Sequence, residues 1–276
     1  MKRKTFIKSI AIMGGASVIS GMYAWQVEPF WLEFVHRKMH IKNLGTSLKG
    51  KTLMQISDMH VGRCNQEFLI QSFKKANLYK PDIIVYTGDF VSYRDQKDLD
   101  ALKDLAPYFV KGRIATLGIL GNHDYGKNWA DARAADQICD VLESNGVQIL
   151  RNTKSNVDGL HIYGIDDKWG TNFNPKACLQ NLDLKQSNLV LCHNPDVADL
   201  DVWNGYNDWI LAGHTHGGQC RPPFLEPPII PVINRRYTAG VFALSNSRTM
   251  YINRALGHSN QVRFNVRPEI TVFELS

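Results

Sequence analysis

The chain has 276 residues, of which 44% are hydrophobic and 21% are charged, and its formal net charge is +6 at pH 7. This composition excludes a disordered chain, a collagen-like repeat and a polytopic membrane protein, and it fits one large globular domain or two small ones. Residues 1–51 carry nine Lys or Arg against two acids, whereas residues 52–276 carry 23 against 24. The positive charge therefore belongs to the N-terminal fifth, and we expect no nucleic-acid binding by the remainder.

Residues 1–25 have the layout of a targeting segment. A basic run, 2–8, precedes the uncharged and mostly apolar stretch 10–25, as in a secretory signal. The run also resembles a twin-arginine export signal, with Lys4 in place of the second arginine. A helix of this length spans about 24 Å, less than the ~30 Å hydrocarbon core of a bilayer. The segment is therefore either cleaved or kept as a short anchor.

Residues 26–51 form a predicted basic, membrane-proximal arm. Aromatic and aliphatic side chains alternate there with His36, Arg37, Lys38 and His40. The arm either lies on an anionic membrane surface or packs on the domain as a lead-in. Residues 45–52 match the phosphate-loop pattern letter for letter, but a predicted strand follows them instead of a helix. We interpret that match as accidental.

From residue 52 to the end, short apolar runs alternate with helix-length segments, and we predict a single domain, 52–276. The predicted strands are 52–57, 82–87, 114–120, 147–150, 160–165, 189–192, 209–211, 249–253 and 270–274, and the predicted helices are 66–79, 97–109 and 129–144. This alternation predicts an α/β layered fold, in which ligands collect at the carboxyl ends of strands. The five cysteines show no C-x-x-C spacing, so neither a disulfide framework nor a zinc ribbon is expected.

Side chains that bind metals follow five of these strands. The motifs are Asp58-Met59-His60, Gly88-Asp89, Gly121-Asn122-His123-Asp124, His193-Asn194 and Gly213-His214-Thr215-His216. One such residue after a strand is usually a turn or capping residue, but five strand ends together indicate a metal site. Aspartate, histidine and amide oxygen suit Mn, Fe or Zn better than Ca. Two such ions about 3.5–4 Å apart would clamp a phosphoryl group.

In this order the motifs resemble those of the calcineurin-like metallophosphoesterase family over about Thr52 to His216. The resemblance extends to the bacterial exported or membrane-associated branch through residues 213–219, the tail 263–270 and Glu28-Pro29. It implies a four-layer α-β-β-α sandwich with a dinuclear metal site at the C-terminal ends of the strands. It also implies an enzyme that hydrolyses phosphoester bonds with two divalent ions as cofactors.

The resemblance assigns a role to each motif residue. The implied metal ligands are Asp58, His60 and His216 for the first ion, Asn122, His193 and His214 for the second, and Asp89 as the bridge. A hydroxide bridging the two ions would be the nucleophile. His123 would be the general acid that protonates the leaving oxygen, and Asp124 would orient and support the imidazole of His123.

Three functions remain open. The first is a phosphodiesterase, in line with the branch that the chain resembles. The second is a UDP-2,3-diacylglucosamine pyrophosphatase, a lipid A precursor hydrolase, whose lipid-linked substrate fits a membrane-proximal arm but requires a cytoplasmic-facing domain. The third is a non-catalytic scaffold, which the complete ligand set disfavours. The N-terminal charge and export-like start favour an extracytoplasmic position at the bacterial inner membrane, with a membrane surface as a partner.

From Arg221 onward the chain has seven Arg and no Lys. Arg235-Arg236, or Arg263 and Arg267, either hold a phosphate next to the scissile one or brace the domain. The pair Asp166-Asp167 either borders the site or forms a turn.

Overall fold

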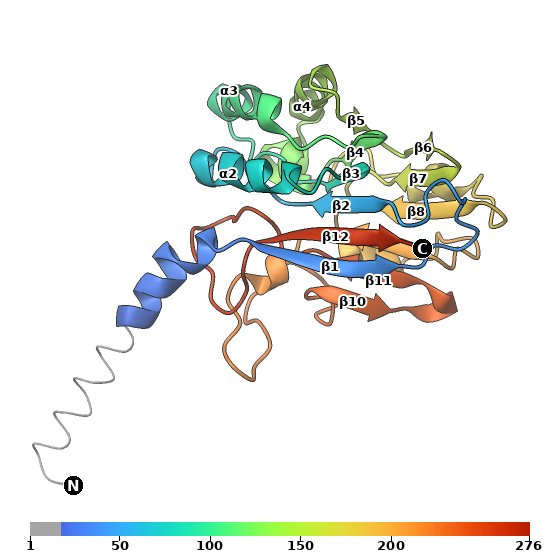
Figure 1. The fold of residues 1–276 in the computed structure, drawn as a ribbon. Coiled ribbons are helices and arrows are strands. Elements are labelled where there is room, and N and C mark those ends of the chain that lie inside the picture. The colour runs from blue at the N-terminus through green and yellow to red at the C-terminus, as the bar shows by residue number, and fades with distance from the viewer. Residues whose placement is uncertain (1–17) are drawn as a thin grey trace, which may run out of the picture.

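The structure, a computed structural model, describes residues 18–276, whose strands form two six-stranded sheets (Figure 1). The order in the first sheet is β1 (Glu33–Met39), β12 (Glu269–Leu275), β2 (Thr52–Ile56), β3 (Ile83–Thr87), β4 (Ala115–Ile119) and β5 (Gln148–Ile149). The order in the second is β10 (Gly240–Ala243), β11 (Thr249–Ile252), β9 (Trp209–Ala212), β8 (Ser187–Leu191), β7 (Leu160–Gly164) and β6 (Thr153–Val157). Strands β2, β3 and β4 run parallel, as do β7, β8 and β9, so their carboxyl ends share one edge of each sheet.

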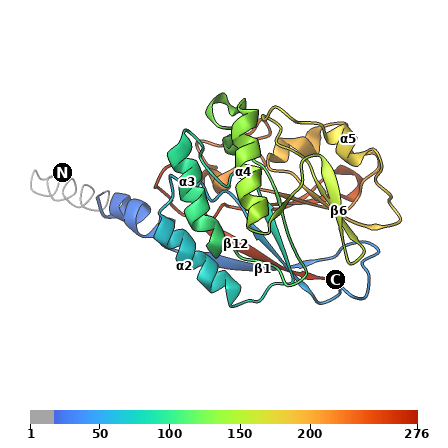
Figure 2. The same cartoon turned by 90° about the horizontal axis from the view of Figure 1, so that it is seen from above.

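Helices cover the outer faces, which confirms the predicted four-layer α-β-β-α sandwich. On the first sheet lie α2 (Gln66–Asn77), α3 (Gln96–Leu105) and α4 (Ala132–Ser144) (Figures 1 and 2). On the second lie α5 (Pro175–Leu179) and the 3-10 turn η5 (Pro195–Asp199). The remaining 3-10 turns are η1 (Glu28–Phe30), η2 (Ala106–Tyr108), η3 (Asn122–Tyr125), η4 (Lys127–Trp129), η6 (His216–Gly218) and η7 (Ser245–Ser247).

The hydrophobic core has three layers that follow from strand periodicity. Along β3, Ile83 and Val85 face the second sheet, whereas Ile84 and Tyr86 face the helices, because successive side chains of a strand point to opposite faces. Both faces of the sheet are thus buried, as the continuous apolar run 82–87 predicts. A third layer packs the second sheet against its own outer cover.

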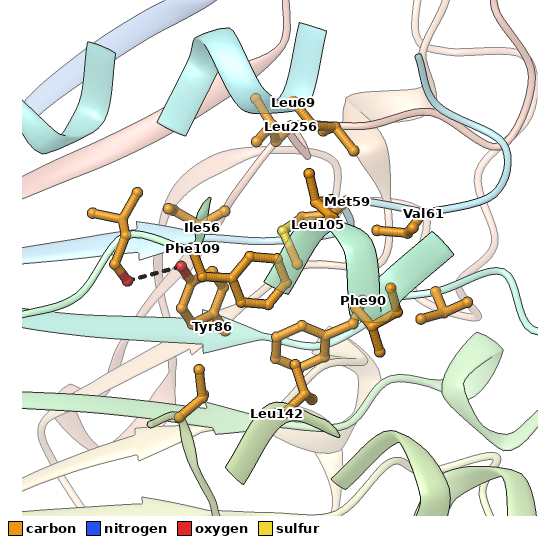
Figure 3. Close-up of a cluster of buried hydrophobic side chains, with 14 of the residues drawn as sticks. Ile56, Met59, Val61, Leu69, Tyr86, Phe90, Leu105, Phe109, Leu142 and Leu256 are labelled. Atoms are coloured by element: carbon orange, nitrogen blue, oxygen red, sulfur yellow. Dashed lines mark hydrogen bonds between the residues drawn. The ribbon is translucent and has the colours of Figure 1, made fainter. Parts of the chain in front are cut away.

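Aromatic rings fill the layer between the helices and the first sheet (Figure 3). The rings of Tyr86 and Phe109 stack with their centroids 5.4 Å apart, and the Phe90 ring lies 5.4 Å from Tyr86. The Tyr86 hydroxyl donates a hydrogen bond of 2.9 Å to the Val110 carbonyl, which satisfies the polar end of this buried ring. This packing fixes the end of β3, directly before Asp89.

The three long helices begin where the sequence places capping residues. The side chains of Asn65, Asp95 and Asp131 each accept a hydrogen bond from a backbone N–H of the following first turn. Such caps satisfy donors that have no partner inside the helix. The predicted helices are confirmed with their ends moved by a few residues, and the end of the predicted helix 97–109 is the 3-10 turn η2.

The sequence pattern does not predict β1, β6 or α5. Strand β1 pairs in parallel with β12 at the edge of the first sheet. Its charged residues Arg37 and Lys38 are exposed, as is common on edge strands, where charge discourages pairing with another chain. Residues 33–39 of the predicted arm therefore belong to the sheet, and the folded unit begins before residue 52.

The N-terminal segment meets the domain through a short stretch of chain. Residues 18–26 are helical, and residues 1–17, which hold most of the predicted targeting segment, lie outside the described part. The Arg263 N–H donates to the Ala24 carbonyl at 2.8 Å, and Gln261 Nε2 donates to the Trp25 carbonyl at 3.1 Å. Among residues 18–276, no helix combines the length and the apolar character needed to cross a membrane.

Candidate metal centre

The five motifs lie together because the chain turns sharply after each parallel strand. Among the predicted metal ligands, positive φ angles occur at Asp58 (53°), His60 (48°), Asp89 (53°), His214 (71°) and His216 (52°). Such left-handed backbone is sparsely populated for residues other than glycine and costs free energy. The surrounding structure stabilises it, and the turns aim the side chains across the strand ends.

Glycines in the motifs make room for these ligands. Gly88 has a φ of +90°, and a Cβ at that position would lie 2.7 Å from His193 Nδ1. A Cβ at Gly213 would lie 2.0 Å from the Ser57 hydroxyl oxygen and 2.4 Å from an Asp58 carboxylate oxygen. The glycines before Asp89 and His214 are thus required by close approach and, at Gly88, also by backbone conformation.

One group of side chains joins the end of β2 to the turn after β9. Ligand atoms of Asp58, His60 and His216 all lie within 4.8 Å of one another, and all three residues are buried. His216 Nε2 lies 3.3 Å from Asp58 Oδ1 and 2.9 Å from His60 Nε2. These are the residues predicted to hold the first metal ion.

Two further groups share Asp89, and one of them also contains His60 of the first group. Asp89, His193 and His214 offer ligand atoms within 4.8 Å of one another, as do His60, Asp89 and His123. His193 Nε2 lies 3.2 Å from Asp89 Oδ2 and 3.2 Å from His214 Nδ1. Asp89 Oδ2 also lies 3.6 Å from Nε2 of His60 in the first group, so Asp89 lies between His60 and His193, a position that suits the predicted bridging carboxylate.

Hydrogen bonds on the far side of each ring fix which nitrogen faces the centre. His60 Nδ1 contacts the Ser92 hydroxyl at 2.8 Å, and His193 Nδ1 contacts the Thr87 carbonyl at 2.7 Å. His214 is reversed, because its Nε2 contacts the Pro231 carbonyl at 2.8 Å. Partners of this kind set the tautomer and orientation of metal-binding histidines. Sequence reasoning missed Ser92, which carries no motif signal beyond its place after Asp89.

Charges inside the cluster shift the pKa of its members. Burial opposes ionisation of Asp58, but the facing imidazoles, His193 foremost, outweigh it and lower the pKa of Asp58 to about 2. Asp89 has its pKa held well below the ordinary value in the same way. Burial lowers the pKa of His60, and of His214 to about 3. Against the effect of burial, the two carboxylates raise the pKa of His193, so they favour positive charge between them.

The donor set fits divalent metal ions. Two buried carboxylates and four imidazoles converge, and the predicted ligand atom Asn122 Oδ1 is buried without a hydrogen-bond partner among residues 18–276. Within the same described part, His216 Nδ1 is also buried and unpaired. Ionised carboxylates and uncharged imidazoles are the forms that bind metals, and this mixture of oxygen and nitrogen suits Mn, Fe or Zn.

His123 and Asp124 differ in their placement. The half-buried ring of His123 lies with its centroid 5.0 Å from that of His60, and the His123 N–H donates to Asp89 Oδ1 at 2.8 Å. The Asp124 carboxylate accepts from the Val91 and Gly121 amides, each at 2.9 Å, and burial raises its pKa to about 8. Both carboxylate oxygens of Asp124 thus accept from the main chain and brace the loop that carries His123. The orienting role of Asp124 toward the His123 imidazole stays a prediction.

A cavity of about 400 Å³ opens beside the ligands. Its inner end is lined by residues that include Asp89, Asn122, His123, His214 and His216, and its outer walls by Trp129, Trp169, Pro228, Ile229, Pro231 and Val262. The indole rings of Trp129 and Trp169 stack with their centroids 4.5 Å apart. The rings of Trp169 and His214 pack in a T-shaped arrangement with their centroids 4.6 Å apart. The site thus has a polar floor and apolar walls.

The pair Asp166-Asp167 forms a turn that supports this wall. Asp167 Oδ1 accepts from the Trp169 and Gly170 amides. Asp166 accepts from the Tyr125 hydroxyl and the Arg151 guanidinium. Burial raises the pKa of Asp167 to about 6. Asp167 therefore makes the predicted turn and positions Trp169, which lines the cavity, whereas the described cavity lining includes neither aspartate.

Three of the four arginines considered as phosphate ligands brace the domain. Arg263 is fully buried and donates to main-chain carbonyls, including those of Ala255 and Val266. The Arg267 guanidinium lies 4.3 Å from the centre of the Trp31 ring. Arg235 donates to the carbonyls of Pro227 and Pro228, and Arg236 is exposed.

Comparison with known proteins agrees with this site. The family model described as calcineurin-like phosphoesterase matches residues 51–218. The chain is 31% identical to an uncharacterized metallophosphoesterase, YkuE, of Bacillus subtilis, over 100% of this chain and 98% of that protein. It is 30% identical to the phosphodiesterase YaeI of Escherichia coli, over 100% and 99%. It is 26% identical to the UDP-2,3-diacylglucosamine pyrophosphatase LpxG of Chlamydia trachomatis, over 95% and 94%.

The chain therefore belongs to the calcineurin-like phosphoesterase family, whose members depend on dinuclear metal centres. It is a hydrolase of phosphoesters, and the motif pattern and the fold agree with this assignment.

Proposed function

We propose that the protein is a phosphodiesterase in which Asp58, His60, Asp89, Asn122, His193, His214 and His216 hold two divalent ions and His123 protonates the leaving oxygen. The observation that carries this proposal is the convergence of these side chains from five strand ends, with Asp89 shared between two groups of ligands. Two ions held in this way would polarise the phosphoryl group and supply the attacking nucleophile.

The residues of the chain set the geometry of the reaction. Asp89 Oδ1 accepts a hydrogen bond from the backbone N–H of His123. This bond fixes the main chain that holds the His123 imidazole beside the proposed ligands. The half-buried imidazole of His123 lines the cavity beside the proposed ligands Asp89 and Asn122, so a phosphoester held by the ions would lie within its reach. Proton donation to a leaving oxygen by a positioned imidazole contributes about 10²–10⁴-fold to a rate.

Two cavities meet at His123, and this favours a diester over a monoester. The first is the apolar cavity described above. The second, of about 270 Å³, shares His123 and Trp129 with it and is lined by Arg63, Arg94 and Lys127. A phosphodiester has two substituents, and each cavity offers room for one of them. The basic lining of the second cavity suits a polar or anionic substituent.

A second candidate activity is hydrolysis of UDP-2,3-diacylglucosamine, a lipid-linked pyrophosphate. The apolar walls formed by Trp129, Trp169 and Ile229 support it, and so does the likeness to the chlamydial LpxG protein. The identities of the two ions are open between Mn, Fe and Zn.

Substrate comparison tests these proposals. The full-length protein, with Mn²⁺ added, is assayed against bis-p-nitrophenyl phosphate, p-nitrophenyl phosphate and UDP-2,3-diacylglucosamine. We expect hydrolysis of the diester to exceed that of the monoester. Faster hydrolysis of the UDP-lipid than of either would favour the second candidate, and no turnover with Mn, Fe or Zn would contradict both. The chain must retain β1 and Glu28, whose buried carboxylate accepts the Val266 N–H.

We also propose that the N-terminal segment attaches the protein to the extracytoplasmic face of a bacterial inner membrane. The basic run 2–8 followed by an apolar stretch supports this. A periplasm-active reporter fused after Ser276 is expected to be active. An active cytoplasmic reporter would place the domain on the cytoplasmic face and would shift the assignment toward the lipid pyrophosphatase.

A further inference from the structure

The loop 222–233 carries apolar side chains that the domain does not bury. Phe224 is completely exposed, and Leu225, Ile229 and Ile233 have 63%, 78% and 81% of their surface accessible. Pro222, Pro223, Pro227 and Pro228 lie in the same loop and restrict its backbone. Soluble domains rarely leave several neighbouring apolar side chains exposed unless a partner covers them.

The loop is held in place by polar contacts at its base. Arg235 donates to the carbonyls of Pro227 and Pro228, and Arg221 pairs with Glu226 at 3.6 Å. Ile230 is buried between the exposed positions. The apolar tip therefore projects from a base that hydrogen bonds hold in place, and its single acidic residue, Glu226, is paired with Arg221.

The loop lies beside the N-terminal helix and the metal centre. Its base joins the segment 261–264, because Arg221 donates to the Phe264 carbonyl at 2.8 Å, and the same segment holds Ala24 and Trp25. Figure 1 shows the N-terminal helix and the orange loop leaving the body on the same side, below the carboxyl end of β2. Pro228 and Ile229 also line the cavity, so the loop forms one lip of its mouth.

The helix presents a matching apolar surface. Val18, Ile19, Met22 and Trp25 are all more than half exposed. Their spacing places them on one face of a helix. The helix and the loop are thus both held by the segment 261–264, whose Val262 lines the cavity. In the sequence, the helix follows the basic residues Lys2, Arg3, Lys4 and Lys8.

We propose that the loop 222–233 is a second membrane contact, which inserts Phe224, Leu225, Ile229 and Ile233 into the surface of an anionic phospholipid bilayer. Exposed aromatic and aliphatic side chains beside basic residues are the features of interfacial binding. Arg221, Arg235 and Arg236 flank the loop against the single acid Glu226, which suits an anionic surface. If the helix and the loop both contact the membrane, the cavity between them and the metal ligands opens toward the bilayer.

This contact defines a substrate class if the proposed phosphoesterase function holds. A phosphoester on a lipid would present its headgroup to the metal ligands while its chains stay near Trp129, Trp169 and Ile229. The substrate would then not have to leave the membrane completely. The membrane contact itself does not depend on catalysis, so it is tested by a measurement that requires no turnover.

A fluorescent label reports the environment of the loop directly. The full-length variant Cys220→Ser with Phe224→Cys is labelled with a polarity-sensitive NBD group and mixed with phosphatidylcholine vesicles that contain phosphatidylglycerol. Four native thiols are buried, and burial raises the pKa of the Cys64 thiol to about 12, so they react slowly with the label. The matched control carries the label at Leu78→Cys, an exposed position after the far end of α2.

We expect NBD emission at position 224 to rise roughly threefold or more and to shift to the blue, because interfacial burial removes water from the probe. Quenching by spin-labelled lipid should accompany this change, and the label at position 78 should show neither effect. Unchanged emission at position 224 on vesicles that bind the protein would overturn the proposal. So would the same emission change without vesicles as protein concentration rises, because a second copy of the chain would then cover the loop. Failure of the hydrolysis assay leaves this result unaffected.

Discussion

The strand-end cluster and the arginine-rich tail are both rich in buried polar groups, but they use them in opposite ways. In the cluster, Asp58, Asp89 and four histidines face one another, and Asn122 Oδ1 finds no hydrogen-bond partner in the described part of the chain. In the tail, Arg263 is equally buried, but both terminal nitrogens of its guanidinium donate to main-chain carbonyls and only its Nε is unpaired among residues 18–276. The Arg254 guanidinium pairs with Glu269 and Glu33. Polar groups that converge on one another indicate a ligand, whereas polar groups satisfied by the main chain indicate architecture.

The largest effect should follow from breaking the cluster at its shared carboxylate. Asp89→Asn removes the charge that lies between both ligand groups, so we expect kcat for bis-p-nitrophenyl phosphate to fall at least about 10³-fold. Circular dichroism should remain native. The exposed carboxylate Asp100 on α3 provides the control, and Asp100→Asn should keep wild-type turnover. Wild-type hydrolysis by Asp89→Asn would refute the site.

A smaller loss of activity should follow at His123. His123→Ala removes the proposed proton donor, so kcat should fall by about 10²–10⁴-fold. The metal content should change little, since the proposed ligands remain. Because the general acid helps most with a poor leaving group, an ester with a more acidic leaving group should lose less activity. The exposed His40 gives the matched control, His40→Ala. Equal losses for every leaving group would argue against proton donation.

Substitutions in the arginine-rich tail should lower the free energy of unfolding and leave the metal centre unchanged. Arg263→Met leaves several buried carbonyls without a donor, and unpaired buried groups cost about 1–3 kcal/mol each. We expect a loss of about 3 kcal/mol in the free energy of unfolding, measured with urea. Arg236→Ala, at an exposed position, should change it by less than about 0.5 kcal/mol. If Arg263→Met unfolds like wild type but loses substrate affinity, the bracing role is wrong.

The smallest effect concerns His258, a buried imidazole of the tail. Burial, together with Arg263, lowers the pKa of His258 to about 4, so the unfolded chain binds the proton more readily. The free energy of unfolding should therefore fall as the pH drops below 6.5. Between pH 7 and pH 5, His258 should account for a loss of about 1–2 kcal/mol. The variant His258→Gln should show a shallower decline in urea titrations at the two pH values. The same decline in both proteins would contradict this assignment.

Local sequence patterns predict the cluster because parallel strands place their carboxyl ends at one edge. The spacing of Asp58, Asp89 and His193 after apolar runs is visible in the sequence, and it leads to residues that the fold brings together. Strand β1 is not visible in this way, since it depends on the remote partner β12 and its charged residues hide the strand pattern. The roles of Arg263 and Asp124 depend on carbonyls and amides brought close by the fold. No residue-type pattern reports such contacts.

The most direct test of the central claim is the metal content of the full-length protein after loading with Mn²⁺ and removal of free metal, measured by inductively coupled plasma mass spectrometry. The account predicts about two ions per wild-type chain. It predicts fewer in Asp89→Asn, because both ligand groups lose the shared carboxylate. One ion or none in a wild-type protein that hydrolyses phosphodiesters, or two ions retained in Asp89→Asn, would contradict a centre built around Asp89.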